Sequence, residues 1–197
     1  MKPCSLSLLL VAGLLSSCVS DLVPPPAPPV TWLDLAVEPL EAAVPLRTDV
    51  GALRVEWEPA EALLSDRLMV RRGPHEVEFD DGARWLRSPV DVLERALEDE
   101  LHGRRGLPSS MAPGTLRVTC TLERFELDLQ GAPAARVGLR AEVHRGEARG
   151  VLLSAGADRA VPAGASTQDA VAALSEALVD SLLELAEQLQ AQLVSGS

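Results

Sequence analysis

The stretch Thr115–Leu129, with the sequence TLRVTCTLERFELDL, decides the fold of this chain. Its apolar residues first alternate at positions 116, 118, 120 and 122 and then continue at 125, 127 and 129. Alternation with a period of two predicts a long β-strand with one face in a core. The change of phase between 122 and 125 predicts a β-bulge near Glu123 and Arg124.

Further strands are predicted on both sides of this stretch. After it, alternating apolar residues at 137–143 and a turn at 145–147 predict a hairpin or meander that continues at 148–154. Before it, strand-like runs are separated by turn sequences at 73–74 and 80–82. These earlier strands are expected at 30–37, 52–57, 68–72, 77–79 and 83–86, with a short helical segment at 60–64.

Two amphipathic helices complete the predicted fold. In the first, Ser88 is the expected N-cap, Pro89 the first helical residue and Asp91 the capping-box partner, and an apolar stripe follows. The second, at 166–193, has a capping box of its own and a leucine-rich stripe along about seven turns. The predicted fold class is therefore α+β, with a mixed or antiparallel sheet packed by two main amphipathic helices.

The composition limits the size and the chemistry of the protein. The chain has 197 residues, 47% of them hydrophobic, which suits one packed domain. Lys2 is the only lysine and tyrosine is absent, so a Schiff base, a phosphate-binding loop and a tyrosine general acid are not expected. The net charge of −11 and the low aromatic content of 3% argue against nucleic acid as a partner.

Residues 1–18 have the pattern of a bacterial lipoprotein signal peptide. Lys2 provides a positive charge, and the apolar stretch after it is too short to span a bilayer. The tetrapeptide Leu-Ser-Ser-Cys at 15–18 resembles a lipobox. Cleavage is therefore expected between Ser17 and Cys18, and the Cys18 thiol is expected to carry a diacylglycerol group. Two or more acyl chains hold a protein stably on a membrane.

The chain divides into four parts. These are a signal peptide (1–17), a lipidated cysteine with a proline-rich tether (18–29), one domain (30–193) and a short tail (194–197). Five prolines within 19–29 favour an extended, semi-rigid spacer. Cleavage removes Lys2 and leaves a net charge of −12, so attachment must depend on lipid rather than on anionic headgroups.

Other patterns in the sequence predict structural roles. The three histidines lack metal-ligand spacing, and the acidic residues at 76–81 are expected on a solvated hairpin. Arg71 and Arg72 are expected to pair with nearby Glu76 and Glu78 across two strands. Cys120 is left without a disulfide partner once Cys18 is acylated, and it is expected to be a small buried core residue.

The order of these elements resembles the ABC-type transport auxiliary lipoprotein family, which includes a component of the paraquat-inducible membrane transport system. The resemblance is carried by Leu68–Arg72, Phe79, the block RWLRSP at 84–89, the motif ERFE at 123–126 and the closing helix. Phe79 stands where the family often has tyrosine, and Leu86-Arg87 replaces a more usual Ala-Glu. The candidate residues for the fold or for partner binding are Arg84, Trp85, Pro89 and Phe125. Trp85 is expected in the core, with a surface contact as the alternative.

The resemblance implies a protein that is not an enzyme and has no cofactor beyond the covalent lipid. Family members work with an ATPase, a permease and a periplasmic protein with MCE domains, and together they move lipids or other hydrophobic molecules across the cell envelope. In well-studied Gram-negative bacteria, Asp after the lipidated cysteine retains a lipoprotein in the inner membrane. Val19 stands at this position, so by resemblance to the other lipoproteins this protein is expected at the outer membrane, facing the periplasm. A homo-oligomer, such as a ring of copies, is left open.

A second class of function stays open from the sequence. An outer-membrane assembly or regulatory lipoprotein, which helps lipopolysaccharide insertion or activates a cell-wall synthase, would share the anchor, the tether and a small α/β domain. A neighbouring gene for an MCE-domain protein would favour transport, and one for a cell-wall synthase would favour the alternative.

Replacement of the lipidated cysteine tests the anchor. The Cys18→Ala variant is expected to lose palmitate labelling and to leave the membrane fraction, because the acyl-accepting thiol is gone. Cys4→Ala is the matched control, since Cys4 lies in the part that cleavage removes, and it should label like the wild type. Undiminished labelling of Cys18→Ala would contradict the lipobox assignment.

Overall fold

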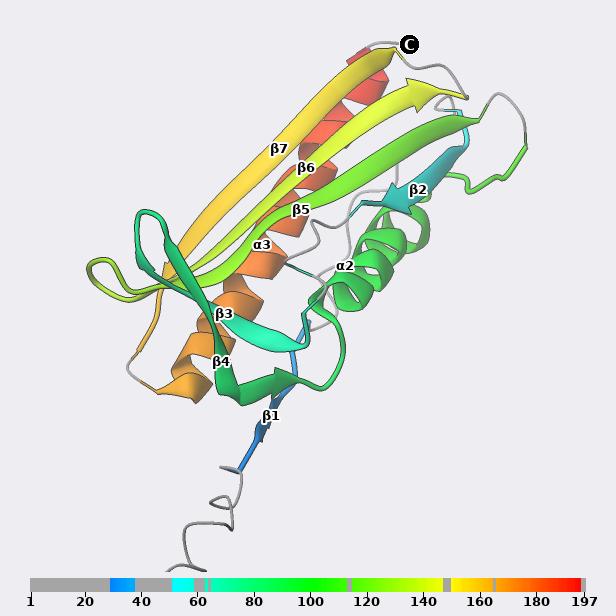
Figure 1. Ribbon diagram of the computed structural model, residues 1–197. Coiled ribbons are helices and arrows are strands. Elements are labelled where there is room, and N and C mark those ends of the chain that lie inside the picture. Colours follow the sequence, from blue (N-terminus) through cyan, green and yellow to red (C-terminus); the bar gives the residue numbers. More distant parts are fainter. Residues whose placement is uncertain are drawn as a thin grey trace, which may run out of the picture.

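The computed structural model describes residues 29–37, 51–58, 63, 65–112, 115–146, 150–164 and 166–195. This part of the chain is an α+β structure with a seven-stranded mixed sheet and two main helices, as the sequence predicts (Figure 1). The predicted signal peptide, the lipobox and nearly all of the helical segment expected at 60–64 lie outside the described residues. Within them, neither helix combines the length and apolar character needed to cross a membrane.

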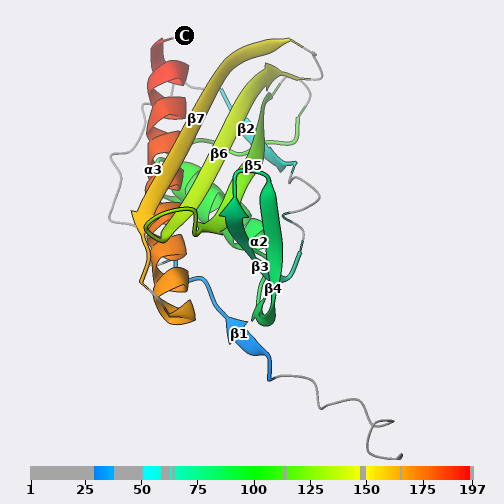
Figure 2. The same ribbon diagram turned by 60° about the vertical axis from the view of Figure 1, so that its left-hand side comes forward.

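The sheet is built around its longest strands. The strands are β1 (Thr31–Leu33), β2 (Leu53–Trp57), β3 (Arg67–Gly73), β4 (Glu76–Trp85), β5 (Leu116–Asp128), β6 (Ala134–Arg145) and β7 (Val151–Pro162). The helical elements are α2 (Pro89–Glu98), a π-helical segment η3 (Asp99–Arg104) and α3 (Thr167–Ser195). The strand order is β1-β4-β3-β5-β6-β7, and β2 pairs with β5. Helix α3 lies along the strands β5, β6 and β7 (Figure 2).

The predicted bulge in β5 is confirmed. Strand β5 pairs antiparallel with β6, and the register shifts between Leu122 and Arg124, so Glu123 is the extra residue. Beyond the shift Phe125 lies opposite Val137, and both side chains are buried. Apolar side chains on the two sides of the bulge therefore enter the same core.

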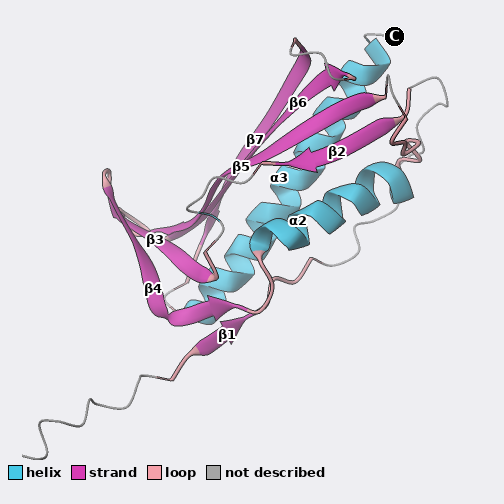
Figure 3. Cartoon of the chain, turned by 45° about the vertical axis from the view of Figure 1, so that its right-hand side comes forward, coloured by secondary structure: helices cyan, strands magenta, loops and turns pink. Residues whose placement is uncertain are grey.

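Two strands, β2 and β3, pair with the same edge of β5. Strand β2 runs parallel to its first half, from Leu116 to Cys120, and β3 runs parallel to its end at Leu127 and Asp128. The bulge falls between these two pairings. Figure 3 shows the result, in which β1, β3 and β4 turn away from the plane of β5, β6 and β7.

Strand β4 is continuous where the sequence predicted a turn and a separate strand. Phe79 pairs with Met69 of β3 and Arg84 pairs with Arg67, so the β4 residues 80–83 lie opposite Leu68 alone. The Gly82 N–H donates to Asp80 Oδ1 at 2.8 Å and closes this wide bulge. The turn-forming residues therefore bend the strand without ending it, because β3 pairs with residues 76–79 before them and both β1 and β3 pair with β4 after them.

Strand β7 is longer than predicted. The strand was expected to end at 154, but it continues to Pro162. The continuation places mostly small residues on the core: Ala155 and Ala157 are buried, and Val161 is partly buried. Small residues suit this strand because α3 packs directly on it. Gln188 of α3 also accepts the Gly156 N–H at 3.2 Å, which satisfies part of the free edge.

Helix α3 contributes a long stripe of leucines to the core. Ser166 and Asp169 form the predicted capping box: the Asp169 N–H donates to Ser166 Oγ at 3.1 Å, and the Ser166 N–H donates to Asp169 Oδ2 at 3.2 Å. The helix continues to Ser195, two residues past the predicted end. The predicted stripe is buried at Leu174, Leu178, Leu182, Leu185, Leu189 and Leu193.

Helix α2 has the predicted N-cap and proline, but the cap bond goes to Val90 rather than to Asp91, the predicted capping-box partner. Ser88 Oγ accepts the Val90 N–H at 3.3 Å, and Pro89 occupies the first turn. The helix continues into η3, where the buried Glu100 carboxylate pairs with Arg105 at 2.8 Å. Arg105 also contacts Gln190, so this ion pair joins the end of the first helix to α3.

Candidate functional site

The predicted motif residues Trp85 and Phe125 meet inside the core. Their rings pack edge to face with centroids 5.5 Å apart, and Trp85 is only 4% exposed. The contact joins the end of β4 to β5 just beyond the bulge. Because Trp85 is buried, its side chain is not available as a surface contact.

The other two motif residues lie at the boundary of this core. Pro89 is buried at the start of α2, where its missing N–H costs no hydrogen bond. Arg84 lies on the opposite face of β4 from Trp85 and pairs with Asp66 at 2.6 Å. The four candidate residues therefore hold β4, α2 and β5 together and do not form one surface site.

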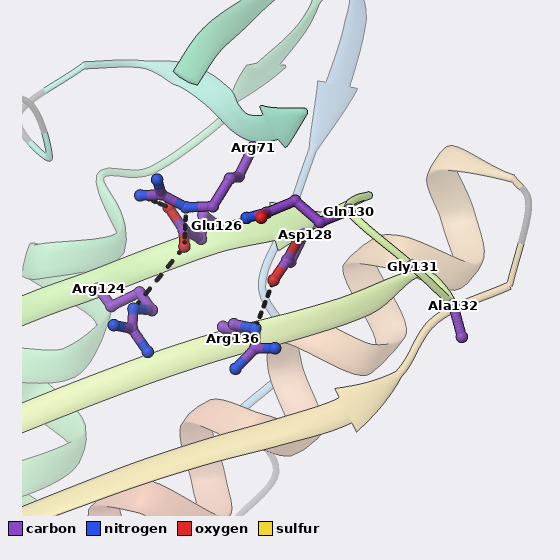
Figure 4. Close-up of a pocket in the computed structure, with 8 residues that line it drawn as sticks. All are labelled: Arg71, Arg124, Glu126, Asp128, Gln130, Gly131, Ala132 and Arg136. Atoms are coloured by element: carbon purple, nitrogen blue, oxygen red, sulfur yellow. Dashed lines mark hydrogen bonds and ion pairs between the residues drawn. The ribbon is translucent and has the colours of Figure 1, made fainter. Parts of the chain in front are cut away.

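A different group of residues forms a polar pocket on the sheet face opposite the helices. Its volume is about 600 Å³, and it lies where β3, β5 and β6 meet at the turn after β5 (Figure 4). The charged members, which we call the arginine cluster, are Arg71, Arg124, Glu126, Asp128 and Arg136. The bulge aligns them, because Arg124, Glu126 and Asp128 lie on the face of β5 opposite to the core residue Phe125.

Glu126 is the buried centre of the arginine cluster. It is 2% exposed, and Arg71 donates to both of its oxygens, through Nε at 2.7 Å and Nη2 at 2.8 Å. The bidentate bond to Glu126 raises the pKa of the Arg71 guanidinium. The predicted charge pairs on β3 are therefore only partly correct. Arg72 pairs with Glu78 at 2.5 Å, as predicted, but Arg71 pairs with Glu126 of β5.

Asp128 is the second carboxylate of the cluster. Its Oδ1 accepts the Gln130 N–H at 2.9 Å, and its Oδ2 accepts Arg136 Nε at 2.7 Å. The backbone hydrogen bond from Gln130 lowers the pKa of Asp128, and the Arg136 guanidinium lowers it further. The side chain is ionised and held in place at neutral pH.

The remaining guanidinium groups are partly open to solvent. Arg124 donates to Asp158 of β7 at 2.9 Å and lies 3.7 Å from Glu126, while its side chain stays 40% exposed. The Arg136 side chain is 39% exposed. A guanidinium carries five N–H donors, so both arginines retain donors for an outside carboxylate or phosphate.

The cluster is suited to binding and not to proton transfer. The oxygens of both carboxylates already accept hydrogen bonds from arginines, Glu126 from Arg71 and Asp128 from Arg136. Cys120 lies elsewhere, buried in the core as predicted, and burial raises the pKa of its thiol to about 12. Among the residues that the structure describes, no group of three or more His, Cys, Asp or Glu is placed to hold a metal ion.

Sequence reasoning missed the arginine cluster. The pattern that could have revealed it lies in the opening stretch, where charged residues at 124, 126 and 128 share the face opposite the apolar ones. Arg71 could not be added from the sequence, because its pairing with Glu126 depends on the parallel contact between β3 and β5.

Solved structures share this fold. A crystal structure of a protein from Xanthomonas campestris matches with a TM-score of 0.66 at 23% identity, over 84% of this chain and 96% of that one. A second crystal structure, of an uncharacterised protein, matches with a TM-score of 0.62 at 11% identity, over 82% of this chain and 99% of that one. No curated protein matches the chain.

The structure is an α+β domain in which the helices cover one side of the sheet and the arginine cluster lies on the other. The family model for the ABC-type transport auxiliary lipoprotein component matches residues 38–189. The chain belongs to this family, as the sequence motifs indicate.

The ion pair between Arg71 and the buried Glu126 can be tested by comparing alanine substitutions at Arg71 and at the adjacent Arg72. Arg71→Ala should lower the free energy of unfolding by about 2–4 kcal/mol, because it leaves the buried Glu126 charge without its main partner. Arg72→Ala removes an exposed pair with Glu78 and should cost no more than about 1 kcal/mol. Urea unfolding measures both; equal losses would contradict the buried role of Arg71.

The lowered pKa of Asp128 predicts a pH dependence of stability. The folded state keeps this carboxyl ionised below its ordinary pKa of 3.8, so the stabilisation present at neutral pH is lost as the pH falls through the lowered pKa. Between about pH 5 and pH 2 the free energy of unfolding should fall more steeply in the wild type than in Asp128→Asn. Urea unfolding at a series of pH values measures this, and equal slopes would overturn it.

Proposed function

We propose that this lipoprotein is the docking component of an MCE-type ABC transport system at the periplasmic face of the outer membrane. In this proposal Cys18 carries the lipid anchor, the partner is a periplasmic protein with MCE domains, and the cargo is a lipid or another hydrophobic molecule. Membership in the transport auxiliary family supports association with such a transporter. The residue Val19 after the lipidated cysteine supports the outer membrane.

The observation that carries the docking role is the polar open face of the sheet with the arginine cluster. The helices bury their apolar stripes against the other face, so the open face is the broad surface left for a partner. Arg71 and Arg136 are held by buried carboxylates, which fixes their guanidinium groups before any partner arrives. Such preorganisation lowers the entropic cost of binding.

The lining of the pocket indicates what it contacts. Five of its lining residues are charged, and all three arginines retain some exposure. Arginine is enriched at protein interfaces, where it forms bidentate bonds with carboxylates. A hydrophobic cargo would leave these charges without solvent or partners, so the cluster suits an acidic segment of the partner protein and not the cargo itself.

Site-specific photo-crosslinking in cells tests the partner and the face together. A photoreactive residue at Ala132, exposed on the rim of the pocket, is expected to capture an MCE-domain protein. The same residue at Glu187, exposed on α3, is the matched control and should capture much less. The products are identified by mass spectrometry.

Two results would contradict the proposal. Capture of only a cell-wall synthase or a lipopolysaccharide-assembly barrel at Ala132 would favour the alternative function. Equal capture of the MCE-domain protein at Ala132 and Glu187 would keep the partner but contradict the open face as its docking surface.

A further inference from the structure

Three large apolar side chains are exposed where the described chain begins. Trp32 is 63% exposed, Leu86 is 61% exposed and Val30 is 40% exposed. We call these residues the β1 patch. The other two tryptophans differ, since Trp85 is buried and Trp57 is partly buried. A tryptophan exposed to this extent requires a reason, because burial of its ring would be strongly favourable.

The strand register places the patch on one face. Leu33 lies opposite Trp85, and both point into the core. The preceding pair in the ladder is Trp32 opposite Arg84. Because side chains alternate along a strand, Trp32 faces outward. The Leu86 N–H donates to the Leu33 carbonyl at 2.7 Å, which holds Leu86 beside β1 on the same outer side.

The charges around the patch neutralise one another. Arg84 pairs with Asp66 at 2.6 Å, and Arg87 pairs with Asp34 at 2.8 Å. The chain as a whole is strongly acidic, which disfavours its approach to an anionic membrane. Around the β1 patch, each of these two acidic residues is paired with an arginine. Local charge repulsion therefore does not oppose apolar contact between the patch and a lipid surface.

The length of chain before the patch decides between a lipid surface and a protein partner. Val30 is twelve residues from Cys18, so even a fully extended tether reaches only about 40 Å. An anchored protein therefore keeps this end of the domain within about 40 Å of Cys18, and the patch reaches the bilayer when the spacer lies along the membrane surface. Tryptophan is enriched at the boundary between headgroups and acyl chains, where the indole ring finds both apolar and polar neighbours. Leucine accompanies it on the apolar face of segments that lie in this boundary.

We infer that the β1 patch contacts the membrane surface, with Trp32 in the headgroup region. The inference rests on the proposed anchor at Cys18 and adds a second point of contact. Two points of contact restrict the orientation of the domain more than attachment at Cys18 alone does. The C-terminal end of α3, at the opposite end of the domain from β1, then points away from the bilayer (Figure 1).

Fluorescence quenching by lipid tests this contact in the full acylated protein. The protein is reconstituted into phosphatidylcholine vesicles whose acyl chains are brominated near the glycerol end, and flotation confirms attachment. The wild type should show vesicle-dependent quenching of tryptophan emission. Trp32→Phe should lose this quenching, whereas Trp57→Phe should retain it.

Two leucine substitutions provide a control in which Trp32, the fluorescent reporter, is unchanged. Leu86→Ser should reduce the quenching, while Leu152→Ser should not, since Leu152 is 53% exposed and lies in β7, away from the patch. Both positions are exposed, so neither change should unfold the protein. Attached protein without quenching, or quenching that persists in Trp32→Phe, would overturn the membrane contact and leave the anchor intact. Protein that fails to float would overturn the anchor, and the inference with it.

Discussion

The extra residue in β5 between Leu122 and Arg124 is the constraint on which the rest of the structure depends. A regular strand would turn Phe125 to the outer face and bring the charged residues after it into the core, because side chains alternate with a period of two. The bulge keeps Phe125 against Trp85 and places Glu126 outside the helix-covered core. It also separates the two segments of β5 that pair with β2 and β3.

The burial of Glu126 follows from this arrangement and connects the two parts of the sheet. A carboxylate that is 2% exposed requires a charged partner, because desolvation of an unpaired ion costs several kcal/mol. Arg71 satisfies this requirement from β3, the strand that carries β4 and β1 with it. The same ion pair therefore holds the bent part of the sheet and orients guanidinium groups on the open face.

The surfaces of the domain differ in chemical character. The leucines of α3 cover one face of the sheet, the arginine cluster lies on the other, and the β1 patch lies at the end nearest the tether. Small side chains on β7 allow α3 to pack along the edge strand, and Gln188 satisfies part of its backbone. In the proposed function, a lipid anchor at one end leaves the open face accessible to a transporter partner.

The sequence by itself determined the fold class, the bulge, both main helices and the family, because each depends on local periodicity, capping or residue order. It did not determine the continuity of β4 through 80–82, the length of β7, or the partner of Arg71. In β4, the pairing of residues before and after 80–82 with β3 and β1 keeps the turn-forming residues within one strand. In β7, α3 packs on buried alanines at 155 and 157, so the strand continues without the alternating large apolar residues that predict one. Glu126 and Arg71 are separated by 55 residues in the chain, so only the parallel pairing of β3 with β5 brings them together.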